Sequence, residues 1–190
     1  DRFDNSAASS NQIRAIWQGG QTSNNVSSVI DYVTIATTGN ALNFGSMFLR
    51  TRQSGNGFSS PIRGFVAGGD DAGYGYIPGV TSRIEFITFA TLSNGTNFGS
   101  MTTTRTRSAS VSSNTRGIIC GGFNGSVHIT STEFITMATA SNGTTFGNLI
   151  TATPDYSGTS NKIRGIVAGE NTVNRIEYIS IATSGASQQF

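Results

Sequence analysis

Short apolar segments recur four times along the chain, separated by polar stretches rich in glycine, serine, threonine and asparagine. Each recurrence has two apolar arms. The first arms read IRAIWQGG, IRGFVAGG, TRGIICGG and IRGIVAGE, and they begin at Ile13, Ile62, Thr115 and Ile163. The second arms read VIDYVTIA, RIEFITFA, STEFITMA and RIEYISIA, and they begin at Val29, Arg83, Ser131 and Arg175. The arginines of the first arms are 49, 53 and 48 residues apart, a period typical of propeller blades and of some helical solenoids.

The second arms have the alternation of β-strands. In the first repeat Ile30 and Tyr32 fall on one side of the extended chain, and Asp31 and Val33 fall on the other. β-Branched and aromatic residues favour strands, and apolar residues on both sides indicate a sheet that is packed on two faces. The first arm is a short apolar strand closed by glycines. A serine- and threonine-rich stretch before it and a Phe-Gly phrase after the second arm complete four strands per repeat.

A four-stranded antiparallel unit cannot bury both of its faces alone, whereas radially stacked copies can. We therefore predict one all-β domain over residues 1–190, a β-propeller of four four-stranded antiparallel blades. The repeats cover approximately residues 1–47, 48–101, 102–149 and 150–190. The phenylalanines of the Phe-Gly phrases are expected to pack between neighbouring blades: Phe44, Phe98 and Phe146. The chain stops at Phe190, in the same phrase, so the repeat predicts either a small closed ring or blades shared between subunits.

Composition and charge narrow the classes of function. Only 12% of the residues are charged, and the formal net charge is +2. The basic residues are eleven arginines and Lys162, spread through the repeats beside ten acidic residues. This distribution argues against nucleic acid as a partner. No apolar run approaches the length of a membrane-spanning helix, so no membrane insertion is expected. The single Cys120 excludes an internal disulfide.

Catalytic motifs are scarce. His128 is the single histidine, and no G-x-S-x-G motif accompanies it. One histidine and one cysteine cannot supply the four ligands of a closed zinc site. We therefore predict that the protein is not an enzyme and has no cofactor and no metal. Asp70 and Asp71 carry oxygens that Ca²⁺ accepts, but a solvated turn is the favoured interpretation of this pair.

Two charged positions recur in every repeat. The basic position holds Arg14, Arg63, Arg116 and Arg164, and the acidic position holds Asp31, Glu85, Glu133 and Glu177. A ligand site would differ between blades, so these residues predict a structural salt bridge or hydrogen-bond network within or between blades.

The connection after the glycine doublet varies between repeats, and variable loops on a rigid frame often carry recognition. It is longest in the second repeat, DDAGYGYIPGVTS. There Tyr74 and Tyr76 accompany Asp70 and Asp71, and tyrosine with carboxylate can stack on a sugar ring and hydrogen-bond to it. These four residues are the candidate ligand-binding site, and a plain exposed loop is the alternative.

The repeats resemble those of kelch-type β-propellers. The resemblance rests on the glycine doublets at Gly19, Gly68 and Gly121 and on the aromatic position Tyr32, Phe86, Phe134 and Tyr178. More narrowly, IEYISIATSG and DYVTIATTGNALNFGSM resemble kelch-like repeats in virion and tail-fibre proteins of tailed bacteriophages.

This resemblance implies a structural or adhesive protein, virion-associated or extracellular, that presents loops to glycans of a host surface. Its partners would be other virion or subunit proteins and a cell-surface glycan. Two other functions stay open at this point: a secreted glycan-binding lectin, and a self-assembling extracellular structural protein.

Overall fold

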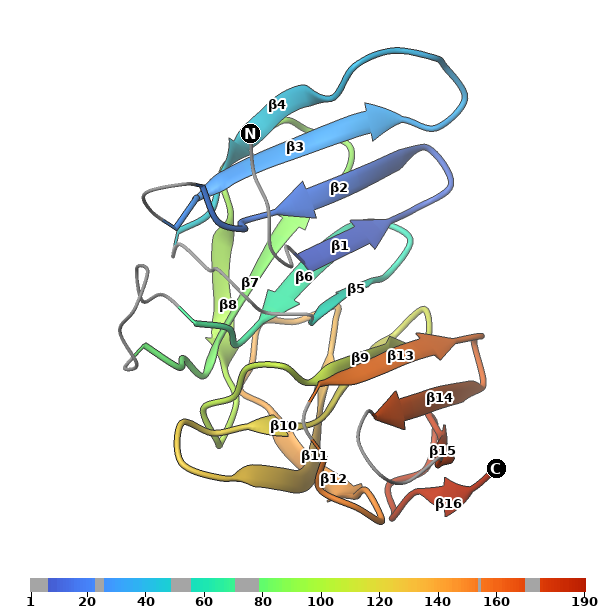
Figure 1. The fold of residues 1–190 in the computed structure, drawn as a ribbon. Helices are drawn as coiled ribbons and strands as arrows, with labels where there is room; N and C mark the ends of the chain where they lie inside the picture. The colour runs from blue at the N-terminus through green and yellow to red at the C-terminus, as the bar shows by residue number, and fades with distance from the viewer. Residues whose placement is uncertain (1–6, 23–25, 49–55, 71–78, 154, 170–174) are drawn as a thin grey trace.

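A computed structural model describes residues 7–22, 26–48, 56–70, 79–153, 155–169 and 175–190. Within these ranges the protein is built of β-strands and contains no helix, so none that could cross a membrane occurs there. The strands form four four-stranded antiparallel sheets arranged as the blades of a propeller (Figure 1). The predicted fold class is confirmed.

Each blade is a meander in which the strands lie in chain order. Blade 1 contains β1 (Ala7–Ser10), β2 (Arg14–Gln18), β3 (Val29–Thr34) and β4 (Leu42–Ser46). Blade 2 contains β5 (Gly57–Ser59), β6 (Arg63–Ala67), β7 (Arg83–Thr88) and β8 (Thr96–Ser100). Blade 3 contains β9 (Ala109–Ser112), β10 (Arg116–Phe123), β11 (His128–Thr136) and β12 (Thr144–Asn148). Blade 4 contains β13 (Tyr156–Ser160), β14 (Arg164–Gly169), β15 (Ile176–Ser180) and β16 (Gln188–Gln189).

The first strand of each blade lies innermost and contacts the first strand of its neighbour. These contacts run from β1 to β5, from β5 to β9 and from β9 to β13. In Figure 1 the four inner strands follow one another through the middle of the molecule, while β4, β8 and β12 lie toward the outside. The serine-rich composition of the inner strands suits this crowded position, because small side chains allow neighbouring sheets to approach closely.

The hydrophobic core consists of three clusters, one between each pair of consecutive blades. We call the side of a blade that packs on the following blade its front face, and the opposite side its back face. The cluster between blades 1 and 2 joins Ile16, Ile30 and Phe44 from one front face to Val66, Ile87 and Phe89 from the next back face. The equivalent clusters contain Phe98 between blades 2 and 3 and Phe146 between blades 3 and 4.

The glycine of the Phe-Gly phrase is required by a close approach of two blades. A Cβ atom on Gly45 would collide with the backbone carbonyl of Ser93, in the β7–β8 hairpin of the next blade. Gly99 meets the backbone of Ser141 in the same way. The hairpin also bonds to the outer strand, because Asn94 Oδ1 accepts from the N–H of Ser46 at 3.0 Å. The phrase therefore repeats because it forms the outer part of each interface between blades.

Candidate functional site

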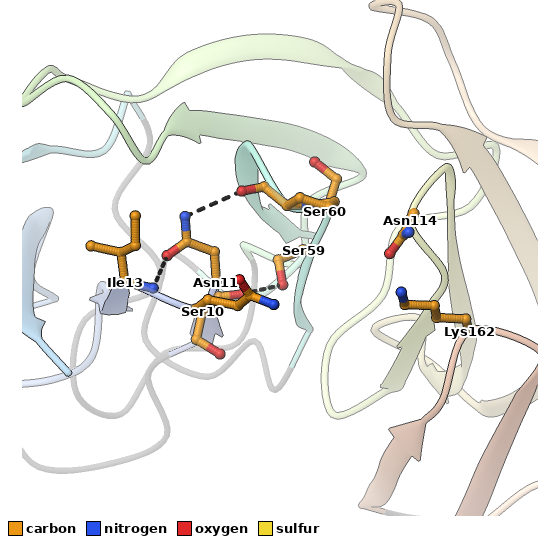
Figure 2. Close-up of a pocket in the computed structure, with 9 residues that line it drawn as sticks. Ser10, Asn11, Ile13, Ser59, Ser60, Asn114 and Lys162 are labelled. Carbon is orange, nitrogen blue, oxygen red and sulfur yellow. Dashed lines mark hydrogen bonds between the residues drawn. The ribbon is translucent and has the colours of Figure 1, made fainter. Parts of the chain in front are cut away.

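A pocket of about 450 Å³ lies where the turns between the first and second strands of all four blades converge (Figure 2). Its lining residues are Ser10, Asn11, Gln12, Ile13, Ser59, Ser60, Pro61, Asn114 and Lys162. Figure 2 shows Asn114 and Lys162 side by side, across the pocket from the residues of blades 1 and 2. We call this feature the axial pocket.

Each turn that lines the axial pocket is fixed by the same side-chain cap. Asn11 Oδ1 accepts from the N–H groups of Ile13 (2.9 Å) and Arg14 (2.8 Å). The equivalent caps are Ser60 Oγ on Ile62 and Arg63, Ser113 Oγ on Thr115 and Arg116, and Asn161 Oδ1 on Ile163 and Arg164. Short polar side chains of this kind hold a turn by bonding to the backbone two and three residues ahead.

The residue after the cap lies at the same structural position in every blade, and all four of these residues line the axial pocket. They are Gln12, Pro61, Asn114 and Lys162. The cap is Asn or Ser and the following arginine is constant, whereas this position holds four different residues: two amides, a proline and a lysine. A repeated frame therefore presents a non-repeated surface, which is the arrangement expected of a ligand site.

The axial pocket offers donors, acceptors and one positive charge. Gln12 and Asn114 supply amides, Ser10 supplies a hydroxyl, and Pro61 supplies an apolar ring face. Lys162 is the single lysine of the chain, and no aspartate or glutamate is among the lining residues. Hydrogen bonds also join the turns, since Asn11 Nδ2 donates to the carbonyl of Pro61 (3.2 Å) and Ser59 Oγ donates to that of Ser10 (2.7 Å). These two bonds hold together the part of the pocket wall that blades 1 and 2 form.

The loop expected to carry recognition leaves the opposite ends of the strands. Asp70 forms an isolated bridge with Val80 at the base of this loop and is partly buried. Asp71, Tyr74 and Tyr76 lie outside the described residues, so a ligand site there stays a prediction.

Sequence reasoning missed the axial pocket. Its signal was a variable residue between a capping Asn or Ser and a constant Arg, but the convergence of four turns depends on how the blades are arranged.

The repeated arginines of blades 1 to 3 reach from their own blade into the next one. Each guanidinium carbon lies over the aromatic ring of its own third strand, as in Arg63 over Phe86 at 4.6 Å and Arg116 over Phe134 at 4.6 Å. Nη1 then donates to carbonyls at the end of the next blade's third strand. The pairs are Arg14 with Phe89, Arg63 with Met137 (2.9 Å) and Ala138 (2.8 Å), and Arg116 with Ile181 (3.3 Å) and Ala182 (2.8 Å).

The repeated carboxylates bond to the chain that leaves the preceding blade. Glu85 Oε2 accepts from Phe48 N–H at 2.9 Å, and Glu177 Oε2 accepts from Ile150 N–H at 2.9 Å. Glu133 Oε2 accepts from Thr102 N–H at 2.6 Å. These three carboxylates are buried, and Asp31 is partly buried. The arginines of blades 1 to 3 therefore bond to backbone carbonyls of the following blade, and the three glutamates bond to backbone N–H groups of the chain that leaves the preceding blade. Two of the glutamates also bond to side chains: Glu133 pairs with Arg105, and Glu177 accepts from Ser187 Oγ within blade 4.

Arg105 is a buried residue that the repeat did not single out. Its side chain donates to the carbonyl of Ser131 (2.8 Å) and pairs with Glu133. Its backbone carbonyl accepts from Gly69 N–H (2.8 Å) in blade 2. Burial lowers the pKa of Arg105, while the adjacent Glu133 carboxylate opposes that shift. Arg105 thus links blade 2 to blade 3 from inside the protein.

The single cysteine is buried, and the single histidine packs against an aromatic ring. Burial raises the pKa of the Cys120 thiol to about 12, so the reactive thiolate is suppressed at neutral pH. His128 packs against Phe123, with ring centroids 5.2 Å apart. No group of three or more His, Cys, Asp or Glu side chains suited to a metal ion occurs among the residues that the structure describes.

Replacing Arg116 with alanine is expected to lower the free energy of unfolding by about 1–3 kcal/mol, because two carbonyls of blade 4 lose their donor and Phe134 loses its stacked cation. Urea denaturation measures this change. Arg164→Ala is the matched control: Arg164 stacks on Tyr178 but bonds to no carbonyl of another blade in the described chain. At protein concentrations low enough to keep copies of the chain apart, Arg164→Ala is expected to lower the free energy of unfolding by about 0.5 kcal/mol or less. Equal losses in the two variants would contradict the role of the carbonyl bonds.

No protein-family model matches the chain, and no curated protein matches its sequence. The propeller arrangement itself is compatible with a non-catalytic binding or structural role.

Proposed function

We propose that this protein is a non-catalytic recognition module that binds an acidic glycan at the axial pocket. The observation that carries the proposal is the position after each turn cap, which places Gln12, Pro61, Asn114 and Lys162 around one cavity. The caps and arginines on either side of these residues recur from blade to blade, whereas the residues that face the cavity differ. A set of groups that served only the fold would be expected to repeat with it.

The groups fit a sugar that carries a carboxylate. Amides and hydroxyls both donate and accept, which matches the paired hydroxyls of a pyranose ring. Lys162 supplies a positive charge for a carboxylate, and the lining contains no acidic side chain to repel it. Pro61 offers an apolar surface for the ring face. Uronic and sialic acids belong to this chemical class.

The biological setting that we propose is a virion or tail-fibre component of a bacteriophage that adheres to host-surface glycans. It rests on the kelch-like character of the repeats and on the phage-like phrases quoted above. A secreted lectin would use the same pocket in a different setting. A self-assembling extracellular protein would make the contacts between chains its main function, and the uncovered end blades described below favour that alternative.

Binding to oligosaccharides that end in a uronic or sialic acid tests the site. Lys162→Ala is expected to weaken this binding about 10- to 100-fold, because a hydrogen bond to a charged group contributes roughly 1.5–3 kcal/mol. Isothermal titration calorimetry measures the affinity, and the neutral sugar of the same linkage is the comparison ligand. Lys162→Arg keeps the charge and should retain most of the affinity.

The double substitution Y74A and Y76A separates the pocket from the loop on the opposite face. Unchanged affinity in this variant, together with a loss in Lys162→Ala, supports the axial pocket. The reverse pattern would move the site to the loop after β6, and binding of neither acidic nor neutral glycans would remove the proposal.

A further inference from the structure

We infer that blade 4 of one copy of this chain packs against blade 1 of a second copy, forming a fourth interface of the same design as the three inside the chain. The inference rests on the two end blades. Each of them leaves uncovered the face that is buried in the other blades, and the two uncovered faces are complementary halves of one interface.

The three interfaces inside the chain follow one rule. The back face of each following blade contributes four equivalent positions: a glycine after the repeated arginine, an aliphatic residue two positions later, one residue of the third strand and the residue that directly follows this strand. In blades 2, 3 and 4 the three apolar side chains are each at most 2% exposed. They are Val66, Ile87 and Phe89; Ile119, Ile135 and Met137; and Val167, Ile179 and Ile181.

The back face of blade 1 has the same apolar character without a cover. Its equivalent side chains are Trp17, Val33 and Ile35. Trp17 is 38% exposed, Ile35 is 52% exposed, and Val33 is only partly buried. The carbonyl of Ile35 occupies the place at which Phe89, Met137 and Ile181 accept from an arginine. Blade 1 therefore presents an apolar surface with its acceptor in position.

The front face of blade 4 presents the other half. Ile166 is partly exposed, whereas its equivalents Ile16, Phe65 and Ile118 are fully buried. Ile176 is 47% exposed, whereas Ile30 and Ile84 are fully buried. The Arg164 guanidinium already lies over Tyr178, at 4.5 Å, in the arrangement that places the other repeated arginines for the next blade.

The inner strands show how the two halves would fit. In each existing interface a side chain of the inner strand fills the space over a glycine of the next blade, and the pairs are Ser9 with Gly64, Phe58 with Gly117 and Val111 with Gly165. The equivalent pair at the ends of the chain is Thr159 with Ala15. Thr159 is close in shape to Val111, so the methyl group of Ala15 requires the two blades to stand slightly farther apart here than they do at Gly165.

A second copy is the occupant that these observations favour, because every copy carries both halves in the register that the internal interfaces use. The contact is heterologous, so it either closes into a ring or continues as a filament. Two copies would give eight blades, which lies within the range of roughly four to eight blades in known propellers. In such a ring the axial pocket of each copy would line part of a shared channel.

A disulfide between two copies tests the interface directly. Thr159→Cys and Ala15→Cys are prepared as separate variants, mixed and oxidised. In the equivalent pair, a Cβ on Gly165 would lie 2.7 Å from Val111 Cβ, so Thr159 and Ala15 need only slightly more separation to reach the roughly 3.5–4.5 Å of a disulfide. The mixture is expected to give a covalent dimer of the 19.9 kDa chain on a non-reducing gel, and each variant alone should give none. Cys120 is fully buried and does not compete.

The outcomes separate a second copy from the alternatives. A double variant that forms an internal disulfide, with no dimer in the mixture, would show that blades 1 and 4 close within one chain and would overturn the inference. Absence of both disulfides would overturn it as well.

Light scattering adds a matched pair of variants. Ile35→Glu is expected to reduce the mass to that of one chain, whereas Ile62→Glu, on a more exposed isoleucine outside these faces, should leave the mass of the assembly unchanged. An unaltered assembly in Ile35→Glu would contradict the proposed face.

Discussion

Replacing Arg105 with alanine is expected to lower the free energy of unfolding by about 3–5 kcal/mol, the range for removing one partner of a buried ion pair. Arg105 and Glu133 are both essentially inaccessible to solvent. The substitution leaves the Glu133 carboxylate buried beside the backbone N–H of Thr102, without its charged partner. It also removes the donor for the Ser131 carbonyl and leaves a cavity between blades 2 and 3.

Urea denaturation followed by tryptophan fluorescence measures this loss, and Arg107→Gln is the control. Arg107 and Asp155 form an exposed pair at 3.9 Å, and exposed pairs contribute at most about 1 kcal/mol. The control should therefore unfold almost as the unaltered protein does. If both variants lost the same small amount, the buried pair would have no special role in joining the blades.

Phe65→Ala is expected to cost a similar amount, about 3–5 kcal/mol, through a cavity in the cluster between blades 2 and 3. The Phe65 ring is fully buried and stacks on Phe58, with centroids 5.2 Å apart and planes within 3°. It also meets Phe98 edge-on at 5.1 Å. Removing this ring deprives aromatic neighbours on the inner and outer strands of the same blade of their common contact.

Thermal and urea unfolding measure the Phe65 variant against Ile62→Ala in the same blade. Ile62 is 64% exposed at the start of the same arm, so its truncation should change the stability by about 0.5 kcal/mol or less. A Phe65 variant as stable as the Ile62 variant would show that the blades do not depend on this cluster.

The repeated phrases are sufficient to predict the strands of a single blade. Alternation in runs such as Arg83–Thr88 places apolar residues on both sides of a strand, and the glycines mark where the strands end or approach a neighbour. Strand alternation is a local property with a period of two residues, and the glycines mark local positions, so both can be recognised in the sequence. The recurrence of the Phe-Gly phrase likewise follows from one contact, the hairpin of the next blade against a glycine.

The candidate site was less accessible to sequence reasoning. The axial pocket depends on four turns that are far apart in the chain, and Lys162 and Gln12 line the same pocket only because the blades share an axis. Arg105 has no equivalent among the four repeated arginines, so a search for the period passes over it. The recurrence of Arg116 and Glu133 indicated a bonded network, but it did not show that each bonds to the backbone of a different neighbour.

The sequence by itself determined an all-β chain of four repeated blades, because strand alternation and close-packed glycines are written within each repeat. Tertiary structure decided which faces of those blades are covered. Ile35 and Ile181 occupy the same place in their repeats, yet Ile181 is buried and Ile35 is exposed. The physical reason is that burial belongs to a pair of surfaces: a residue pattern specifies an apolar face, but only the arrangement of the blades in space supplies the neighbour that covers it.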